Sequence, residues 1–137
     1  MRPGPGVLSA GGLVMVDTCI WIASEKDADV ATLLIELTTR DRLVICGLVY
    51  AEILRGLQDP DLRDRRARQF LALQWVESTP EMWRKTAEMA RTQDRLGHPV
   101  PLTDVHVAAL CLENELALWT TDHHFDRFPA LCRFLQD

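Results

Sequence analysis

The sequence lacks an apolar stretch long enough to cross a membrane. A membrane helix needs about 20 consecutive apolar residues, and the runs here, such as residues 13–16, are much shorter. That run ends at Asp17 without a signal-peptide cleavage site. We therefore expect a cytoplasmic protein that does not associate with membranes. Residues 1–12 are predicted to form a flexible leader, with Met15 as an alternative start, and residues 13–137 a single domain.

Closely spaced cysteine and histidine ligands are also missing. The four cysteines include no Cys-x-x-Cys pair, which argues against a structural zinc site and suits a reducing compartment. His98 and His106 are far apart, and His123 and His124 are adjacent. Neither spacing is typical of a zinc cage.

An excess of positive charge is absent, since the formal net charge is −5. Proteins that bind nucleic acids usually carry a basic surface. Acidic side chains gathered around a metal ion would account for part of the negative charge. The net charge therefore does not exclude a nucleic acid as the partner.

Short apolar runs alternate along the chain with segments of helical periodicity. Four runs are predicted to be strands: residues 13–16, 43–46, 75–76 and 116–119. Runs without polar alternation are typical of parallel strands that are buried on both faces. The predicted fold class is α/β, a three-layer α/β/α sandwich with a mostly parallel central sheet.

Helices are expected between these strands. Residues 27–37 show apolar side chains at i, i+3, i+4 and i+7. Thr79 and Pro80 are expected to begin a helix that ends near Leu96, with Thr79 as its N-cap. Thr103 is expected to cap a buried helix after the proline-rich loop, and residues 125–135 to form a short helix and an edge strand.

Four acidic residues follow predicted strands or lie near the start of the helices after them: Asp17, Glu52, Asp104 and Asp122. Ligands of open parallel sheets bind at the carboxyl ends of the strands, so these acids are expected at one rim. Burying several ionised carboxylates is costly unless they bind a cation. Hard oxygen ligands favour Mg²⁺ or Mn²⁺ over zinc, so the pattern predicts a divalent metal site.

Three of these acids also have an ordinary structural explanation. Asp104 would be favoured by the dipole of its helix, Glu52 would pair with Arg55, and Asp122 would cap a short helix. Asp17 has the least structural purpose, because a carboxylate at the end of a buried strand is costly.

The motifs around these acids resemble those of the PIN-domain ribonucleases, and most closely the VapC-type toxins of bacterial toxin–antitoxin pairs. The matching segments are Val16-Asp17-Thr18, Tyr50–Gly56, Leu102–Ala109 and Leu118–Phe125. Their order and spacing agree across residues 13–135. The resemblance implies a PIN-like fold and an endoribonuclease that depends on Mg²⁺ or Mn²⁺. It implies a toxin that hydrolyses RNA and inhibits translation or growth until a VapB-type antitoxin binds, and it suggests a homodimer.

The resemblance also implies the roles of individual residues. The catalytic acids would be Asp17, Glu52, Asp104 and Asp122. Of these, Asp17, Asp104 and Asp122 would be the metal ligands, supported by the hydroxyl groups of Thr18 and Thr121. Relatives often carry a further acid where this chain has His124. One firmly held metal ion is therefore expected rather than two.

The RNA contacts and the function itself have alternatives. Arg84, Arg91 and Arg95 share one helical face and are candidate RNA contacts, or an ordinary solvated face. A second basic cluster lies within residues 63–68. Two other functions stay open: a phosphoryl-transfer domain that uses Asp17 as acceptor, and a non-catalytic binding module of a toxin–antitoxin complex.

Overall fold

A computed structural model describes residues 12–135 of the chain. The predicted leader, residues 1–12, lies outside the described residues apart from Gly12. Within residues 12–135, none of the helices is both long enough and apolar enough to span a bilayer.

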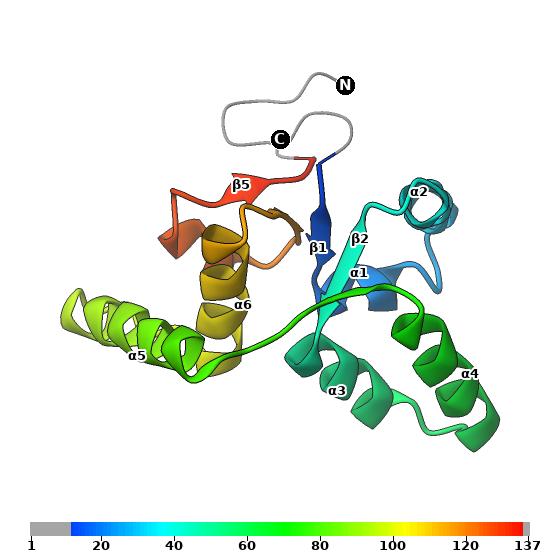
Figure 1. Cartoon of the computed structure of the whole chain (residues 1–137), viewed down its shortest axis with the longest axis horizontal. Coiled ribbons are helices and arrows are strands. Elements are labelled where there is room, and N and C mark those ends of the chain that lie inside the picture. The colour runs from blue at the N-terminus through cyan, green and yellow to red at the C-terminus, as the bar shows by residue number, and fades with distance from the viewer. Residues whose placement is uncertain (1–11, 136–137) are drawn as a thin grey trace.

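The centre of the fold is a parallel sheet of five short strands (Figure 1). The strands are β1 (Val14–Val16), β2 (Leu43–Cys46), β3 (Gln74–Val76), β4 (Ala117–Trp119) and β5 (Cys132–Arg133). Their order is β3-β2-β1-β4-β5, and every neighbouring pair is parallel. The four predicted strands and the predicted C-terminal edge strand are confirmed.

Six α-helices and one 3₁₀ helix connect the strands. They are α1 (Thr18–Ala23), α2 (Ala28–Thr39), α3 (Gly47–Gly56), α4 (Pro60–Leu71), α5 (Pro80–Arg95), α6 (Leu102–Glu113) and η1 (His123–Arg127). The start of α5 is as predicted, with Thr79 Oγ1 accepting a hydrogen bond from the backbone N–H of Met82. The prediction that Thr103 caps α6 was wrong. Pro101 occupies the N-cap and its extended backbone lets the helix begin at Leu102.

The side chains of the central strands alternate between two apolar clusters. Val14 and Val16 pack with Leu34 and other residues of α1 and α2, whereas Met15 belongs to the cluster that contains residues of α3 and α6. Because strand side chains point alternately to opposite faces, both faces of the sheet are covered by helices. The predicted three-layer α/β/α fold is confirmed, and the sheet is entirely parallel.

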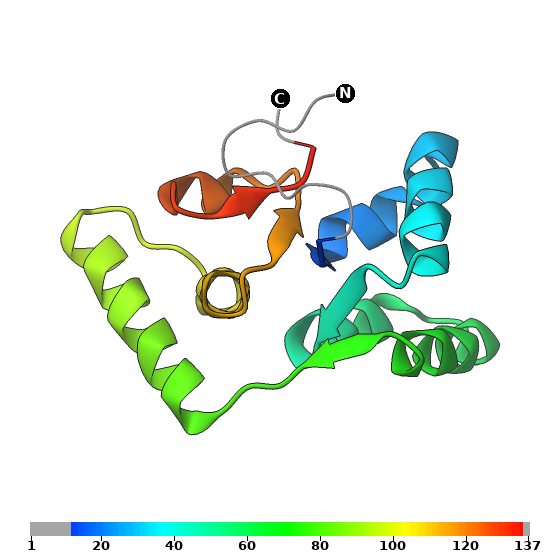
Figure 2. The ribbon, with the colours of Figure 1, turned by 45° about the horizontal axis from the view of Figure 1, so that its top comes forward.

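Helix α6 lies between the sheet and α5. Figure 2 views α6 almost along its axis, with α5 along one side of it and the strands on the other. The side chains from Val105 to Cys111 are all buried. The first turn of α6, which carries Asp104, is therefore the part of the helix that reaches the site.

Candidate metal centre

Asp17 directly follows β1 and is held by donors on both carboxylate oxygens. Its Oδ1 accepts a hydrogen bond of 2.9 Å from the backbone N–H of Thr18 and so caps α1. Its Oδ2 accepts hydrogen bonds from Thr120 Oγ1 at 2.8 Å and from Cys19 Sγ at 3.4 Å. The side chain is 6% exposed. A carboxylate this deeply buried is stable only when such donors, or a cation, compensate its charge.

Thr120 is a supporting hydroxyl that the sequence analysis missed. It donates to Asp17 and also accepts a hydrogen bond of 3.0 Å from the backbone N–H of Asp122. Thr121, the predicted hydroxyl, is exposed and donates only to Cys19 Sγ, at 3.6 Å. The sequence could have indicated Thr120, because side chains two residues apart in an extended segment lie on the same side of the chain. Thr120 thus shares a side with Asp122, whereas Thr121 does not.

Asp104, Asp122 and His124 converge on one point. One oxygen of each carboxylate and one ring nitrogen of His124 all lie within 4.8 Å of one another. Nδ1 of His124 is 2.8 Å from Asp104 Oδ2 and 3.3 Å from Asp122 Oδ1. The side chain of Asp122 also caps η1 by accepting the backbone N–H of His124 at 2.9 Å. Asp122 therefore has the structural role that the sequence allowed, while it also faces Asp104.

The electrostatics of this cluster favour a cation. Partial burial raises the pKa of Asp104, and the negative charges of Asp122 and Asp17 raise it further, against the lowering effect of the hydrogen bond with His124. The same hydrogen bond to Asp104 raises the pKa of His124. The charges of two further acids therefore act on Asp104, and a divalent ion would relieve this repulsion.

Glu52 is connected to these acids indirectly. Its Oε1 accepts a hydrogen bond of 3.2 Å from Thr18 Oγ1, beside Asp17. It is not a member of the group formed by Asp104, Asp122 and His124. The described residues show no ion pair between Glu52 and Arg55, the structural alternative of the sequence analysis.

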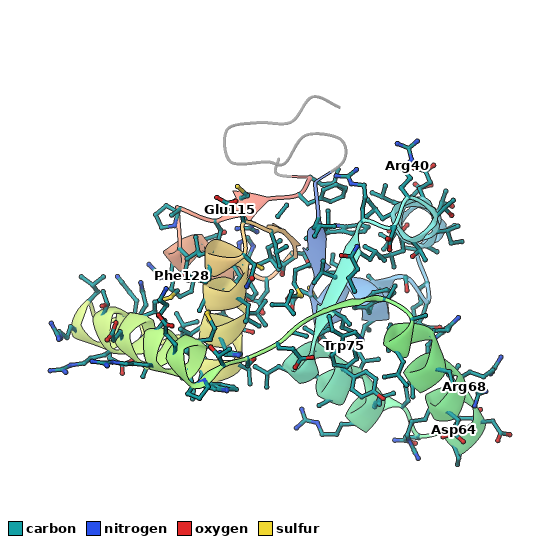
Figure 3. All side chains as sticks on the ribbon, viewed as in Figure 1. Arg40, Asp64, Arg68, Trp75, Glu115 and Phe128 are labelled. Carbon is teal, nitrogen blue, oxygen red and sulfur yellow. The ribbon has the colours of Figure 1, made fainter. Side chains whose placement is uncertain are left out.

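The candidate RNA-binding arginines lie on α5, outside the acidic cluster. Arg84 pairs with Glu88 at 3.5 Å, and both side chains are largely exposed. Arg91 and Arg95 are exposed further along the same helix. The second basic segment belongs to α4, at the opposite side of the molecule, where Arg68 points outward (Figure 3).

The donor set fits a divalent cation. Two carboxylates and one imidazole already converge, and oxygen-rich sites of this kind bind Mg²⁺ or Mn²⁺. Within residues 12–135 this is the one group of three such side chains close enough to share an ion. The group differs from the predicted set of metal ligands, because it includes His124 and does not include Asp17, whose charge nevertheless raises the pKa of Asp104.

Solved structures with similar folds include chains from the following three bacteria. VapBC2 from Rickettsia felis, bound to a DNA fragment from its promoter, contains a chain with 18% identity and a TM-score of 0.74, covering 88% of this chain and 96% of that one. DNA-bound VapBC from Salmonella typhimurium gives 21% identity, coverages of 90% and 96%, and a TM-score of 0.73. VapBC-1 from nontypeable Haemophilus influenzae gives 23% identity, coverages of 91% and 97%, and a TM-score of 0.71.

These likenesses extend over nearly the whole length of each chain, and at such identities they establish a shared fold. None of the curated proteins compared with this sequence matches it. The family model of the PIN domain matches residues 14–131, which include β1, β4 and every acid of the candidate centre. The protein therefore belongs to the PIN domain family.

Proposed function

We propose that this protein is an endoribonuclease that depends on Mg²⁺ or Mn²⁺, and that it is the VapC-type toxin of a toxin–antitoxin pair. The observation that carries the proposal is the convergence of Asp104 and Asp122, with the charge of Asp17 acting on Asp104, at the rim of a PIN-domain sheet. The similar solved structures are VapBC toxin–antitoxin complexes.

Asp17, Asp104 and Asp122 would hold the ion. When bound, the ion would offset the charge of the scissile phosphate and lower the pKa of a water molecule at the site. The hydrogen bonds from Thr120 and the Thr18 backbone keep the Asp17 carboxylate in one orientation before the ion arrives. This chemistry does not use the ribose 2′-hydroxyl as nucleophile. Cleavage should therefore leave a 5′-phosphate and a 3′-hydroxyl, and a 2′,3′-cyclic phosphate product would contradict it.

Cleavage of total RNA tests this proposal. Cleavage should require Mn²⁺ or Mg²⁺, stop on addition of a chelator, and be lost in Asp17→Asn and Asp104→Asn. Asp61→Asn is the matched control, because Asp61 lies in the first turn of α4 as Asp104 lies in the first turn of α6. Circular dichroism establishes that the variants are folded. Cleavage without metal, or equal cleavage by Asp104→Asn and Asp61→Asn, would reject the nuclease assignment.

The antitoxin, we infer, docks in an apolar groove of about 860 Å³ beside Glu52. The groove is lined from α1 to α4 by residues that include Trp21, Ile35 and Phe70. Asp41 and Glu52 also line it and supply negative charge, whereas Glu25 pairs with Arg66, another lining residue, at 3.2 Å. A partner segment with apolar side chains and basic residues would complement both properties. Its Arg or Lys side chains would pair with Asp41 or Glu52.

A substitution in the groove tests the docking site, with a cognate VapB-type antitoxin as the binding partner. Ile35→Arg should weaken binding of that protein at least about tenfold, the loss typical of a disrupted interface anchor, and leave RNA cleavage intact. Leu96→Arg is the control, because Ile35 and Leu96 are exposed to similar extents, 66% and 62%, and Leu96 lies outside the groove. Equal binding by both variants would place the antitoxin elsewhere.

The two alternative functions make different predictions. A phosphoryl-transfer domain should become phosphorylated on Asp17 by a small phosphodonor. Such a site also needs a nearby cationic side chain. Lys85 does not supply it, because its Nζ forms an ion pair with Glu113 at 2.6 Å. A non-catalytic binding module would retain its toxicity in growing cells after Asp17→Asn. The proposed homodimer is tested by sedimentation of the purified chain.

A further inference from the structure

His106 is a fully buried polar side chain that the proposed chemistry does not use. It lies on α6, two residues after Asp104, and is 0% exposed. Both ring nitrogens have hydroxyl partners: Thr86 Oγ1 lies 2.7 Å from Nδ1, and Ser78 Oγ lies 2.7 Å from Nε2. Thr86 belongs to α5 and Ser78 to the segment that precedes α5. One ring thus joins α6 to two separate parts of the chain.

The hydroxyl of Thr86 determines the direction of these bonds. It donates its one hydrogen to the carbonyl oxygen of Met82 at 2.9 Å, so towards His106 it acts as an acceptor. Nδ1 of His106 therefore carries the hydrogen and donates to Thr86. Nε2 is left as the acceptor for Ser78. The ring is held as a neutral imidazole in one tautomer and one orientation.

The face of the ring is fixed as well. The indole of Trp83 stacks on His106 with ring centroids 3.6 Å apart and planes 5° apart. Trp83 and Thr86 both lie on α5. The ring therefore can neither rotate nor shift along α5 without losing a hydrogen bond or the stacking contact.

The start of α6 has no other polar anchor of this kind. Pro101, at its N-cap, makes no side-chain hydrogen bond, whereas α1, α2, α4 and α5 are each capped by a side chain. Capping side chains fix the first turn of a helix. Asp104 lies in the uncapped first turn, and its partner His124 has a side chain that is 50% exposed.

We propose that His106 is a positioning residue that sets the place of the Asp104 carboxylate. Residues two apart on a helix lie about 200° apart around its axis. When His106 faces α5, Asp104 therefore faces the opposite side, toward Asp122 and His124. A rotation or shift of the first turn displaces both side chains together. The inference rests on the proposed metal-binding role of Asp104.

The variant Thr86→Val tests this role with little change in side-chain shape. It removes the acceptor for Nδ1 of His106 but retains His106 itself. The matched control is Thr92→Val, because Thr92 Oγ1 donates to the carbonyl of Glu88, four residues earlier, as Thr86 does to Met82. Unlike Thr86, Thr92 is exposed, and it has no hydrogen bond to a histidine among the described residues. Ser78→Ala removes the other ring partner.

Two measurements on the purified, full-length chain are informative. In the metal-free protein, the side-chain carboxyl ¹³C signal of Asp104 should shift in Thr86→Val and stay unchanged in Thr92→Val. The dissociation constant for Mn²⁺ should rise about tenfold in Thr86→Val, the lower end of the losses seen when groups that orient metal ligands are removed. His106→Asn, which retains a donor near the position of Nδ1, should recover part of the affinity lost in His106→Leu.

The outcomes separate this proposal from its alternatives. If Thr86→Val lowers only the melting temperature, and leaves the Asp104 signal and the Mn²⁺ affinity unchanged, His106 has a structural role alone and the proposal is wrong. If the wild-type chain binds no Mn²⁺, the proposed function fails, while the Asp104 signal of the metal-free protein still decides whether His106 positions that carboxylate. Because Thr86→Val retains the His106 side chain, the test remains available should His106→Leu fail to fold.

Discussion

Thr120 Oγ1 donates a hydrogen bond of 2.8 Å to Oδ2 of Asp17, although the two residues are 103 positions apart in the chain. The bond joins the residue after β4 to the residue after β1, at the carboxyl ends of two paired strands. The same hydroxyl accepts the backbone N–H of Asp122. One threonine therefore sets the relative position of two candidate metal ligands.

Replacing this threonine should affect both stability and metal binding. Thr120→Val leaves Oδ2 of a buried carboxylate with one donor fewer, and should lower the free energy of unfolding by about 2 kcal/mol. It should also weaken Mn²⁺ binding. Denaturant unfolding and Mn²⁺ titration measure the two effects. Thr121→Val should change both much less, since Thr121 is exposed, and equal effects of the two variants would contradict this role of Thr120.

A divalent ion should stabilise the folded chain. Binding relieves the repulsion that raises the pKa of Asp104. At an ion concentration of tenfold the dissociation constant, it should add about 1.4 kcal/mol to the free energy of unfolding. Thermal melts with Mn²⁺, before and after chelation, measure the gain. Asp104→Asn should abolish this gain in stability, and Asp61→Asn should retain it. A wild-type melting temperature that does not change on addition of Mn²⁺ would argue against the site.

His124 should limit how tightly the ion is held. His124→Asp replaces an imidazole that binds Asp104 and Asp122 with a further carboxylate. Additional ligand charge strengthens binding of hard cations, so the affinity for Mn²⁺ should rise about tenfold. Titration calorimetry gives the affinity and shows whether a second ion binds. His123→Asp, beside it in sequence and pointing to Asp126 instead, is the control and should change the affinity little.

The buried His106 should make the chain less stable in acid. Burial lowers its pKa, so between the folded-state pKa and the unfolded value of about 6.5 the unfolded chain binds more protons. Stability therefore falls as the pH drops below about 6.5, until the folded-state pKa is passed.

Urea unfolding between pH 7.5 and 5.0 measures this dependence. On acidification, His106→Gln should lose less of its free energy of unfolding than the wild-type chain does. The comparison with wild type isolates His106, because His124, whose pKa is raised by Asp104, acts in the opposite direction. His98→Gln, at an exposed site, should leave the profile as in wild type. The same loss of stability in His106→Gln would show that another group causes it.

The exposed arginines of α5 should contribute to RNA binding. In an inactive Asp104→Asn background, Arg91→Gln with Arg95→Gln should weaken binding of single-stranded RNA. Each lost phosphate contact lowers the slope of log affinity against log salt by about 0.7, so two contacts give about 1.4. The control pair is Arg65→Gln with Arg68→Gln, both exposed on α4. Equal losses from both pairs would indicate nonspecific attraction to positive charge.

Several features of the fold were readable from local sequence because their causes are local. The apolar runs at residues 14–16 and 43–46 can be buried only as strands covered on both faces, and both are central strands here. Thr79 and Pro80 begin α5 because an N-cap hydroxyl and a fixed φ act within one turn. The start of α6 was misplaced by two residues, because Pro101 takes the N-cap position expected for Thr103.

By itself, the sequence determined the α/β architecture and the placement of Asp17, Asp104 and Asp122 near strand ends or helix starts. Only the tertiary structure decided that Thr120, rather than Thr121, supports Asp17, that His124 joins the acidic cluster, and that His106 joins α6 to α5. These contacts link residues 20 to 103 positions apart. They depend on strand register and helix rotation, which are fixed when the whole core packs.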